Sequence, residues 1–259
     1  MTGTVIDVPW CSRFHGAGME EGPAAVAAAL GITGSDVVEL SLEEPPLEAL
    51  VAGLPRLHDA VAAADGVPLA LLGECTLAPA VTAGLRRLHP DLVLVWVDAH
   101  GDLNTPATSP SGFLGGMPFA ILLGWCHEPL RRAAGAEPPL PEDRAALVGA
   151  RDLDPGERDS ISRSRLVVAD DIAGALRALP AGTPVHLHLD GDVLDPDAAP
   201  GVDFPAPGGW SGERLDAEMA ALAESSRVVG VSVCCGNPRR DPDGRGARAY
   251  ARALQPLWS

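Results

Sequence analysis

The sequence of 259 residues contains no lysine, so all 19 of its basic residues are arginine and lysine Schiff-base chemistry is excluded. It has no uninterrupted apolar run of about twenty residues, and we therefore expect no membrane span. No basic segment precedes an apolar stretch in the opening MTGTVIDVPW, so we expect no signal peptide and a cytoplasmic location. The five cysteines are odd in number and are expected to be reduced thiols.

The sequence has far fewer basic than acidic residues. The chain has 35 acidic residues and a formal net charge of −16 at pH 7, which argues against nucleic acid and anionic membranes as partners. The hydrophobic content of 46% suffices for a full core, and no repeat or low-complexity linker divides the chain. We therefore predict one domain over residues 1–259. The sequence does not indicate an oligomeric state.

Short apolar runs alternate along the chain with amphipathic stretches rich in Ala and Leu. This alternation predicts an α/β fold in which helices cover both faces of one parallel sheet. The predicted strands are Thr4–Val8, Val37–Leu40, Leu69–Leu72, Leu92–Val97, Ala146–Gly149, Leu166–Ala169, Val185–Leu189 and Val228–Val233. The predicted helices are Pro23–Leu30, Leu47–Ala63, Leu77–Leu88, Pro155–Arg163 and Gly212–Ser225. In such a sheet ligands bind beyond the carboxyl ends of the strands, where polar residues of this sequence gather.

Two groups of potential metal ligands follow two of these strands. Asp98, His100 and Asp102 stand at alternate positions after Leu92–Val97 and share a face if the chain stays extended. In HLHLDGDVLDP the alternate positions again carry potential ligands, namely His186, His188, Asp190 and Asp192. Carboxylates with some imidazole suit one or two hard divalent cations, with Mn²⁺ the natural candidate.

The motifs DAHGD and HLDGDVLDPDAAPG resemble the DAHxD and SxDxDxxDP signatures of the arginase (ureohydrolase) family. The resemblance spans nearly the whole chain, in the family's order. It implies a three-layer α/β/α sandwich on an eight-stranded, mainly parallel sheet. It also implies a manganese-dependent hydrolase that acts on the C–N bonds of linear amidines.

The resemblance further implies roles for the metal ligands. Asp98 and Asp190 would bridge two manganese ions, and His100 and Asp192 would complete one of the two sites. Asp102 would belong to the other site and would handle a proton when a metal-activated water attacks the guanidinium carbon.

Three positions depart from the family pattern. In LGECTLA the metal-binding histidine of the family is Cys75, whose thiolate suits zinc better than manganese. The second metal site is therefore expected to be weak, empty or altered, with one or two metal ions per chain. Gly115 replaces a histidine near the leaving group, and Cys235 replaces the acid that grips the guanidinium. We predict that the Cys75 and Cys235 thiols approach one another. The alternative interpretation of the three departures is that the protein is a catalytically impaired member of the family.

The positions that relatives use for the amino-acid end of the substrate persist. Asp154 and Glu157 match positions that meet an α-amino group, while Asn104, Ser111 and also Ser109 match positions that meet an α-carboxylate. Each could alone be a loop or helix cap, and DPGE also reads as a helix start. Together they favour an α-amino acid substrate over a decarboxylated amine such as agmatine.

Several features resemble one branch of the family, the N-omega-hydroxy-L-arginine amidinohydrolases of D-cycloserine-type biosynthesis. These features are Cys75, the segments HGDLNTP and GFLGGM, and His188 in place of a serine. The branch releases hydroxyurea and ornithine. Hydrolysis of another guanidino or formimino acid stays open as an alternative. For His188, a catalytic role and a hydrogen-bonded structural role have equal weight.

Overall fold

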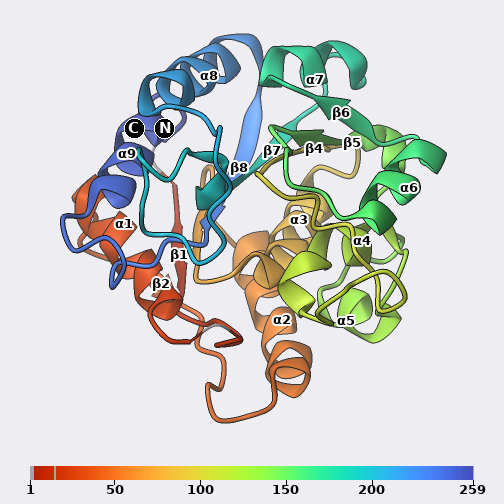
Figure 1. Cartoon of the computed structure of the whole chain (residues 1–259), viewed down its shortest axis with the longest axis horizontal. Helices are drawn as coiled ribbons and strands as arrows, with labels where there is room; N and C mark the ends of the chain where they lie inside the picture. The colour runs from red at the N-terminus through yellow and green to blue at the C-terminus, as the bar shows by residue number, and fades with distance from the viewer. Residues whose placement is uncertain (1–2, 15, 259) are drawn as a thin grey trace.

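A parallel sheet forms the centre of the computed structural model, which describes residues 3–14 and 16–258 (Figure 1). Within these residues, eight strands follow the order β2-β1-β3-β8-β7-β4-β5-β6, and every pair is parallel. The strands are β1 (Val5–Val8), β2 (Asp36–Val37), β3 (Leu69–Leu72), β4 (Val93–Val97), β5 (Ala145–Val148), β6 (Val167–Ala169), β7 (Val185–Asp190) and β8 (Val228–Cys234). The ends of the predicted domain, residues 1 and 259, lie outside the described part.

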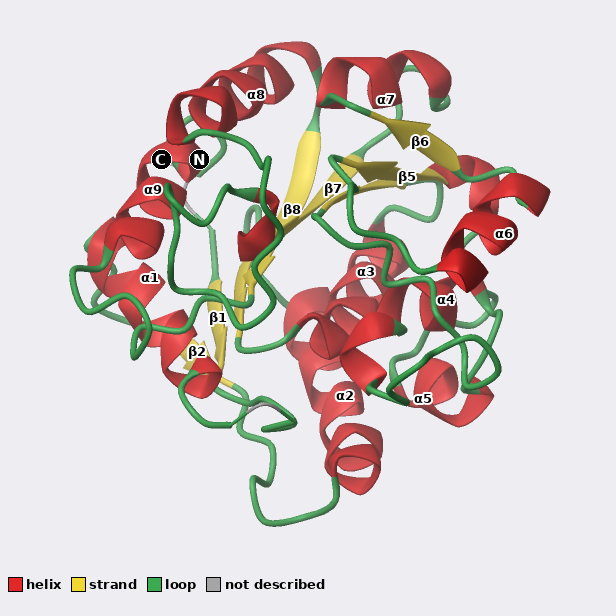
Figure 2. Cartoon of the chain, viewed as in Figure 1, coloured by secondary structure: helices red, strands yellow, loops and turns green. Residues whose placement is uncertain are grey.

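Helices lie on both sides of the sheet (Figure 2), which confirms the predicted α/β/α sandwich. One layer holds α2 (Pro46–Ala62), α3 (Ala78–Leu88), α4 (Pro118–Leu123) and α5 (Glu128–Ala133). The other holds α1 (Gly22–Leu30), α7 (Ile172–Ala178), α8 (Gly212–Ser225) and α9 (Arg245–Leu254). The remaining long helix is α6 (Pro155–Arg163), whose range is the predicted one. None of the described helices is long and apolar enough to cross a membrane.

The alternation of side chains along the strands builds a hydrophobic cluster on each face. In β4, Trp96 packs into the cluster under α2 and α3, while its neighbour Val95 packs into the cluster under α8 and α9. All five residues of β4 are buried, because a parallel sheet covered on both faces leaves no side of the strand in water. The continuous apolar run VLVWV therefore predicts this strand correctly.

The edge strand β2 is shorter than predicted. Pairing with β1 stops at Val37, although Val38 still donates its backbone N–H to Asp7 O at 2.9 Å. The chain then leaves the sheet, and Leu40 packs against Gly53 of α2, where a Cβ would collide with the Leu40 side chain. Burial of Leu40 under a helix, and not strand pairing, explains the apolar character of this segment.

The central strands end side by side. Because β3, β8, β7 and β4 are neighbours and all parallel, their carboxyl ends meet at one edge of the sheet. The residues that follow these four ends carry the acids, thiols and imidazole singled out in the sequence. The fold therefore brings segments far apart in the chain to one place, as parallel sheets commonly do at their ligand sites.

His186 of β7 is expected to make the stability of the protein depend on pH. Its buried ring has Nδ1 3.1 Å from Thr82 Oγ1 and Nε2 3.0 Å from Ser232 Oγ. Burial lowers the pKa of His186 from 6.5 to about 3, so between these values the unfolded chain binds a proton that the folded protein does not. The contribution of the neutral His186 ring to the free energy of unfolding is therefore complete above pH 6.5 and is lost as the pH falls towards 3.

The free energy of unfolding of the wild type should decrease when the pH is lowered from about 7 to about 5. In His186→Gln, which lacks this ring, the decrease should be smaller by about 2 kcal/mol. Urea unfolding at the two pH values measures the difference. His89→Gln, at a less buried histidine after α3, is the matched control and should change the pH slope much less. An unchanged slope in His186→Gln would contradict the assignment.

Candidate functional site

A cavity of about 220 Å³ opens at the carboxyl edge of the central strands. Each of the site residues predicted from the sequence lines it, except His188. The lining residues among them are Cys75, Asp98, His100, Asp102, Asn104, Ser109, Ser111, Asp154, Glu157, Asp190 and Asp192. The sequence pattern therefore located one connected site, although the role of each residue stays a prediction.

Asp98, His100 and Asp192 form an oxygen-rich group with ligand atoms that all lie within 4.8 Å of one another. His100 Nδ1 lies 3.0 Å from Asp192 Oδ2 and 3.6 Å from Asp98 Oδ1. Trp96 Nε1 donates to Asp98 Oδ2 at 3.0 Å, and the backbone N–H of Ala99 donates to Asp192 Oδ1 at 3.2 Å. These bonds hold both carboxylates in place. Both also line the cavity, so their remaining lone pairs are available to a ligand there.

Asp102 has a buried carboxylate oxygen, Oδ2, without a hydrogen-bond partner. Its backbone has φ of 52°, a left-handed conformation that a non-glycine residue rarely adopts and that marks functional sites. The turn also depends on Gly101, where a Cβ would lie 2.6 Å from Glu157 Oε1. Burial and then the charge of Asp98 raise the pKa of Asp102 well above its usual value. A bound cation would remove the cost of this orphaned oxygen.

Negative charge dominates the cavity. Among the described residues that line it, His100 is the only basic side chain. Burial followed by the charge of Asp98 raises the pKa of Asp192 to about 7. Burial alone would lower the pKa of His100, but its contacts with Asp192 and Asp98 raise it to about 12. Buried acids with so little positive charge around them fit a site for divalent cations.

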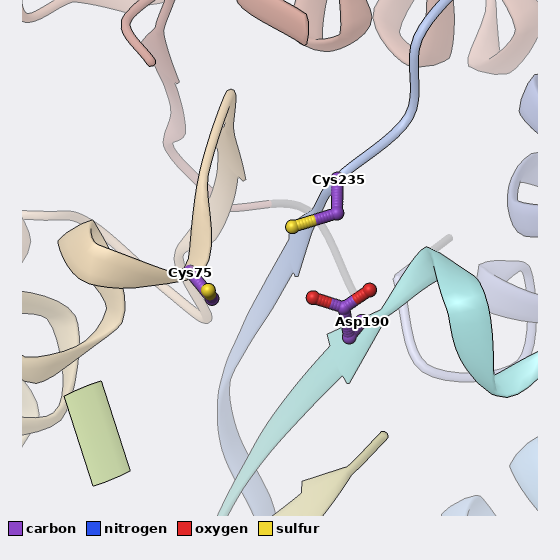
Figure 3. A group of neighbouring side chains, drawn as sticks. All are labelled: Cys75, Asp190 and Cys235. Carbon is purple, nitrogen blue, oxygen red and sulfur yellow. The ribbon is translucent and has the colours of Figure 1, made fainter. Parts of the chain in front are cut away.

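Cys75, Asp190 and Cys235 form a second group, the thiol group, with one donor atom from each within 4.8 Å of the others. Figure 3 shows the three side chains pointing toward one another. Cys75 begins the short helix η2 (Cys75–Leu77), Asp190 ends β7, and Cys235 directly follows β8 with φ of 64°. The predicted approach of the two thiols is confirmed. It arises because β3 and β7 both lie beside β8 in the sheet.

His188 lies beneath the cavity and does not line it. Its Nδ1 is 2.8 Å from Ser232 Oγ, its Nε2 is 3.6 Å from Cys234 Sγ, and its ring packs 3.8 Å from the Trp96 ring centroid. Burial lowers the pKa of His188 to about 4, so the ring is neutral. His188 therefore contacts Trp96 and Cys234, which in turn donate hydrogen bonds to Asp98 and Asp190.

Asn104, Asp154 and Glu157, which are predicted to meet the amino-acid end of the substrate, also line the cavity. Asn104 Nδ2 donates to Asp154 Oδ2 at 2.8 Å. Asp154 also starts α6 as part of a capping box with Glu157. Glu157 already accepts from the backbone N–H groups of Leu103 and Asp154, at 2.9 and 2.8 Å, so its carboxylate links the start of α6 to the loop after β4. The helix-start interpretation of DPGE is correct and is compatible with a place in the site.

The two predicted site serines, Ser109 and Ser111, are less buried. Ser109 Oγ accepts a hydrogen bond from the backbone N–H of Gly112 at 3.0 Å, and Ser111 Oγ accepts one from Phe113 at 3.2 Å. Both side chains line the cavity, and each hydroxyl keeps its proton for a further acceptor.

Sequence reasoning missed other lining residues. Glu74 is buried beside Cys75 and accepts from Ser12 Oγ and Thr76 Oγ1 at 2.6 and 2.9 Å. An acid directly after a buried strand, in GECT, was a usable signal for it. No comparable signal existed for Phe113 and Phe204, whose stacked rings have centroids 5.4 Å apart and come from two separate loops. At Gly115 a Cβ would collide with the Phe113 ring, so this ring takes the space of a side chain at the position where the family resemblance implies a histidine.

Comparison with known proteins agrees with these motifs. A model described as the Arginase family matches residues 4–258. The arginase of Bacillus subtilis is 31% identical, over 99% of this chain and 97% of the relative. The N(omega)-hydroxy-L-arginine amidinohydrolase of Streptomyces lavendulae is 34% identical, over 73% of this chain and 67% of the relative. The crystal structure of arginase from Bacillus cereus superposes with a TM-score of 0.87 at 29% identity, over 99% of this chain and 97% of that one.

These similarities confirm the predicted hydrolase of C–N bonds in linear amidines at the level of the family, and they give no support to the impaired-relative alternative. Identity does not separate the substrates, since it is 31% to an arginase and 34% to the hydroxyarginine enzyme. The extent of the match, the parallel eight-stranded sheet and the acidic cavity lead to one statement: this chain belongs to the arginase family.

Proposed function

We propose that this protein is a manganese-dependent amidine hydrolase that acts on an arginine-like α-amino acid, with N-omega-hydroxy-L-arginine as the leading substrate. The products would then be hydroxyurea and ornithine. One observation carries the proposal: the oxygen-rich group and the Asp154–Asn104 pair line a single cavity. A cytoplasmic location and the absence of nucleic-acid and membrane partners remain predictions from the sequence.

The oxygen-rich group fits a hard cation. Asp98, His100 and Asp192 would hold it, because they offer oxygen and imidazole donors in the form that manganese prefers. When bound, a divalent ion makes a water molecule acidic enough to attack the amidine carbon near neutral pH. Asp102, whose Oδ2 is buried and unpartnered, would take the proton from that attack.

His188 supports the ligands in this proposal and does not touch the substrate. Through Trp96 it steadies Asp98, and through Cys234 it steadies Asp190. Partners of this kind commonly orient metal ligands. We therefore choose the structural role from the two that the sequence left open.

The amino-acid end of the substrate would be recognised by an ion pair and hydrogen bonds. Asp154 would pair with the α-ammonium group, and Asn104, Ser109 and Ser111 would donate to the α-carboxylate. Glu157 would hold Asp154 in place through the capping box. A substrate with both charged groups satisfies this end better than an amine without a carboxylate.

The amidine end favours a less basic group than a plain guanidinium. Cys235 stands where relatives have an acid, and the Phe113 ring occupies the space left by Gly115. An N-hydroxyguanidine is less basic than a guanidine, because the hydroxyl oxygen withdraws electrons, so it needs less counter-charge. This difference supports hydroxyarginine over arginine.

A substrate panel tests the proposal. The manganese-loaded protein should release hydroxyurea from N-omega-hydroxy-L-arginine with a larger kcat/KM than it shows for urea release from arginine or agmatine. Formiminoglutamate and other guanidino acids complete the panel. Preferred turnover of one of those compounds would replace the proposed substrate, and turnover of none would contradict the proposed activity.

A further inference from the structure

We propose that the thiol group, Cys75, Asp190 and Cys235, is a zinc site beside the oxygen-rich group, so that the centre binds two chemically different metal ions. The inference rests on the proposed metal-dependent function, but it concerns which ion each group selects. Three described donors from three separate parts of the chain converge there (Figure 3).

The geometry suits a tetrahedral ion. The donor atoms of the three residues lie within 4.8 Å of one another. Zn–S bonds of about 2.3 Å at tetrahedral angles require the two sulfur atoms to be about 3.8 Å apart, and Zn–O bonds require similar spacings. Binding of the ion would therefore need the donor atoms to be no farther apart than the upper limit that the structure sets. Asp190 is fixed for this purpose, since the backbone N–H of Asp192 donates to its Oδ1 at 3.0 Å.

A second observation points to a ligand at the same place. Asp102 Oδ2 is buried without a hydrogen-bond partner and belongs to the same cavity. Cys75 and Asp102 both line this cavity. Asp102 is not one of the three close donors, so the fourth tetrahedral position is left to it or to a water molecule. A bound cation would satisfy this oxygen and offset the repulsion between the acids and the thiols.

The thiol group and the oxygen-rich group are expected to prefer different metal ions. Thiolate is a soft ligand that selects zinc over manganese, whereas the carboxylates and imidazole of the oxygen-rich group accept manganese. A single histidine-to-cysteine change would only weaken a manganese site. Here Cys235 adds a second sulfur to the same position, which converts the site to one that fits zinc.

Metal content after competitive loading tests the inference without measuring turnover. Metal-free protein is given one equivalent of Zn²⁺ per chain and an excess of Mn²⁺ under a non-thiol reductant, since excess zinc would also displace manganese from the oxygen-rich group. It is then dialysed and analysed for both elements. The wild type should retain about one zinc and about one manganese ion per chain. Cys75→Ser and Cys235→Ser should each lose most of the zinc and keep the manganese, which also shows that they fold. Cys126→Ser, at a half-buried thiol outside the cavity lining, is the control and should keep both ions.

Cobalt(II) gives an independent readout. Bound in place of zinc, it should produce a thiolate-to-metal charge-transfer band in the near ultraviolet that the Cys75→Ser and Cys235→Ser proteins lack. Cys75→His should shift the site towards a second manganese ion. Two manganese ions and no zinc in the wild type, zinc retained by a Cys75→Ser/Cys235→Ser protein, or a Cys75–Cys235 disulfide that persists under reductant would overturn the proposal. A protein that binds both ions but turns over no substrate would contradict the proposed function alone.

Discussion

Asp190→Asn is expected to abolish metal retention while leaving the protein folded. Asp190 is a member of the thiol group, and by the family resemblance it also bridges to the oxygen-rich group. Its Oδ1 accepts from Asp192 N–H and its Oδ2 accepts from Cys234 Sγ. Asparagine can keep the first bond through its amide oxygen and turn its NH₂ group towards the Cys234 sulfur, so it keeps the size of the side chain but loses the charge. Since loss of a mere supporting residue weakens metal binding about 10- to 100-fold, loss of a shared ligand should weaken it by more than about 100-fold.

The same variant should show opposite effects on stability with and without metal. Burial, and then the charge of Asp192, raise the pKa of Asp190 well above its usual value, so this carboxylate is unfavourable in the metal-free protein. Metal-free Asp190→Asn should therefore be at least as stable as metal-free wild type. Added manganese should raise the melting temperature of the wild type only, since a ligand at about 100 times its Kd adds about 2.7 kcal/mol.

Elemental analysis after dialysis and thermal unfolding with and without manganese measure the two effects. Asp195→Asn is the matched control, because Asp195 lies in the same motif but only caps a turn. Its oxygens accept from the backbone N–H groups of Asp197 and Gly208, at 3.0 and 2.8 Å. If Asp190→Asn kept its full metal content, Asp190 would not be a shared ligand.

The success of the sequence analysis has a physical basis. Residues after the strands of a parallel sheet share one edge, so Asp98, Asp190 and Cys235 could be assigned to the same edge, and the family resemblance then indicated that they lie close together. The approach of Cys75 to Cys235 follows from the same rule. The apolar runs identified the strands because both faces of this sheet are buried, and strand parity placed His186 and His188 on one face.

What could not be predicted depends on contacts between loops. Phe113 reaches the space beside Gly115 because the chain turns there into the short helix η3 (Leu114–Gly116), and no periodic pattern predicts such a turn. The short helices α4 and α5 span six residues each, too few for a helical period to stand out. His188 has the same parity as Asp190, but only its packing on Trp96 and Ser232 shows that it lies beneath the cavity.

Asp154→Asn is expected to cause the largest loss of substrate recognition. The side chain lies at the end of the cavity, where Asn104 Nδ2 donates to it at 2.8 Å, and it is the N-cap of α6. Asparagine is as good an N-cap as aspartate, so the helix start should survive the substitution. Only the charge is removed, and a charged partner lost from a desolvated site costs about 2–5 kcal/mol. With tenfold for each 1.4 kcal/mol, kcat/KM for an α-amino acid substrate should fall by about 30- to 4,000-fold, mostly through KM.

A deaminated substrate analogue isolates the charge pair. An analogue that keeps the carboxylate and the amidine group but lacks the α-ammonium should be poor for the wild type, and it should lose little more in Asp154→Asn. Asp171→Asn removes the corresponding charge at the N-cap of α7, where Oδ1 accepts from Gly174 N–H at 2.6 Å, and should leave both substrates unaffected. Equal losses on the two substrates would assign Asp154 to the helix start alone. A loss confined to the α-amino acid would place the ammonium group against Asp154, because only that pair of charges differs between the four measurements.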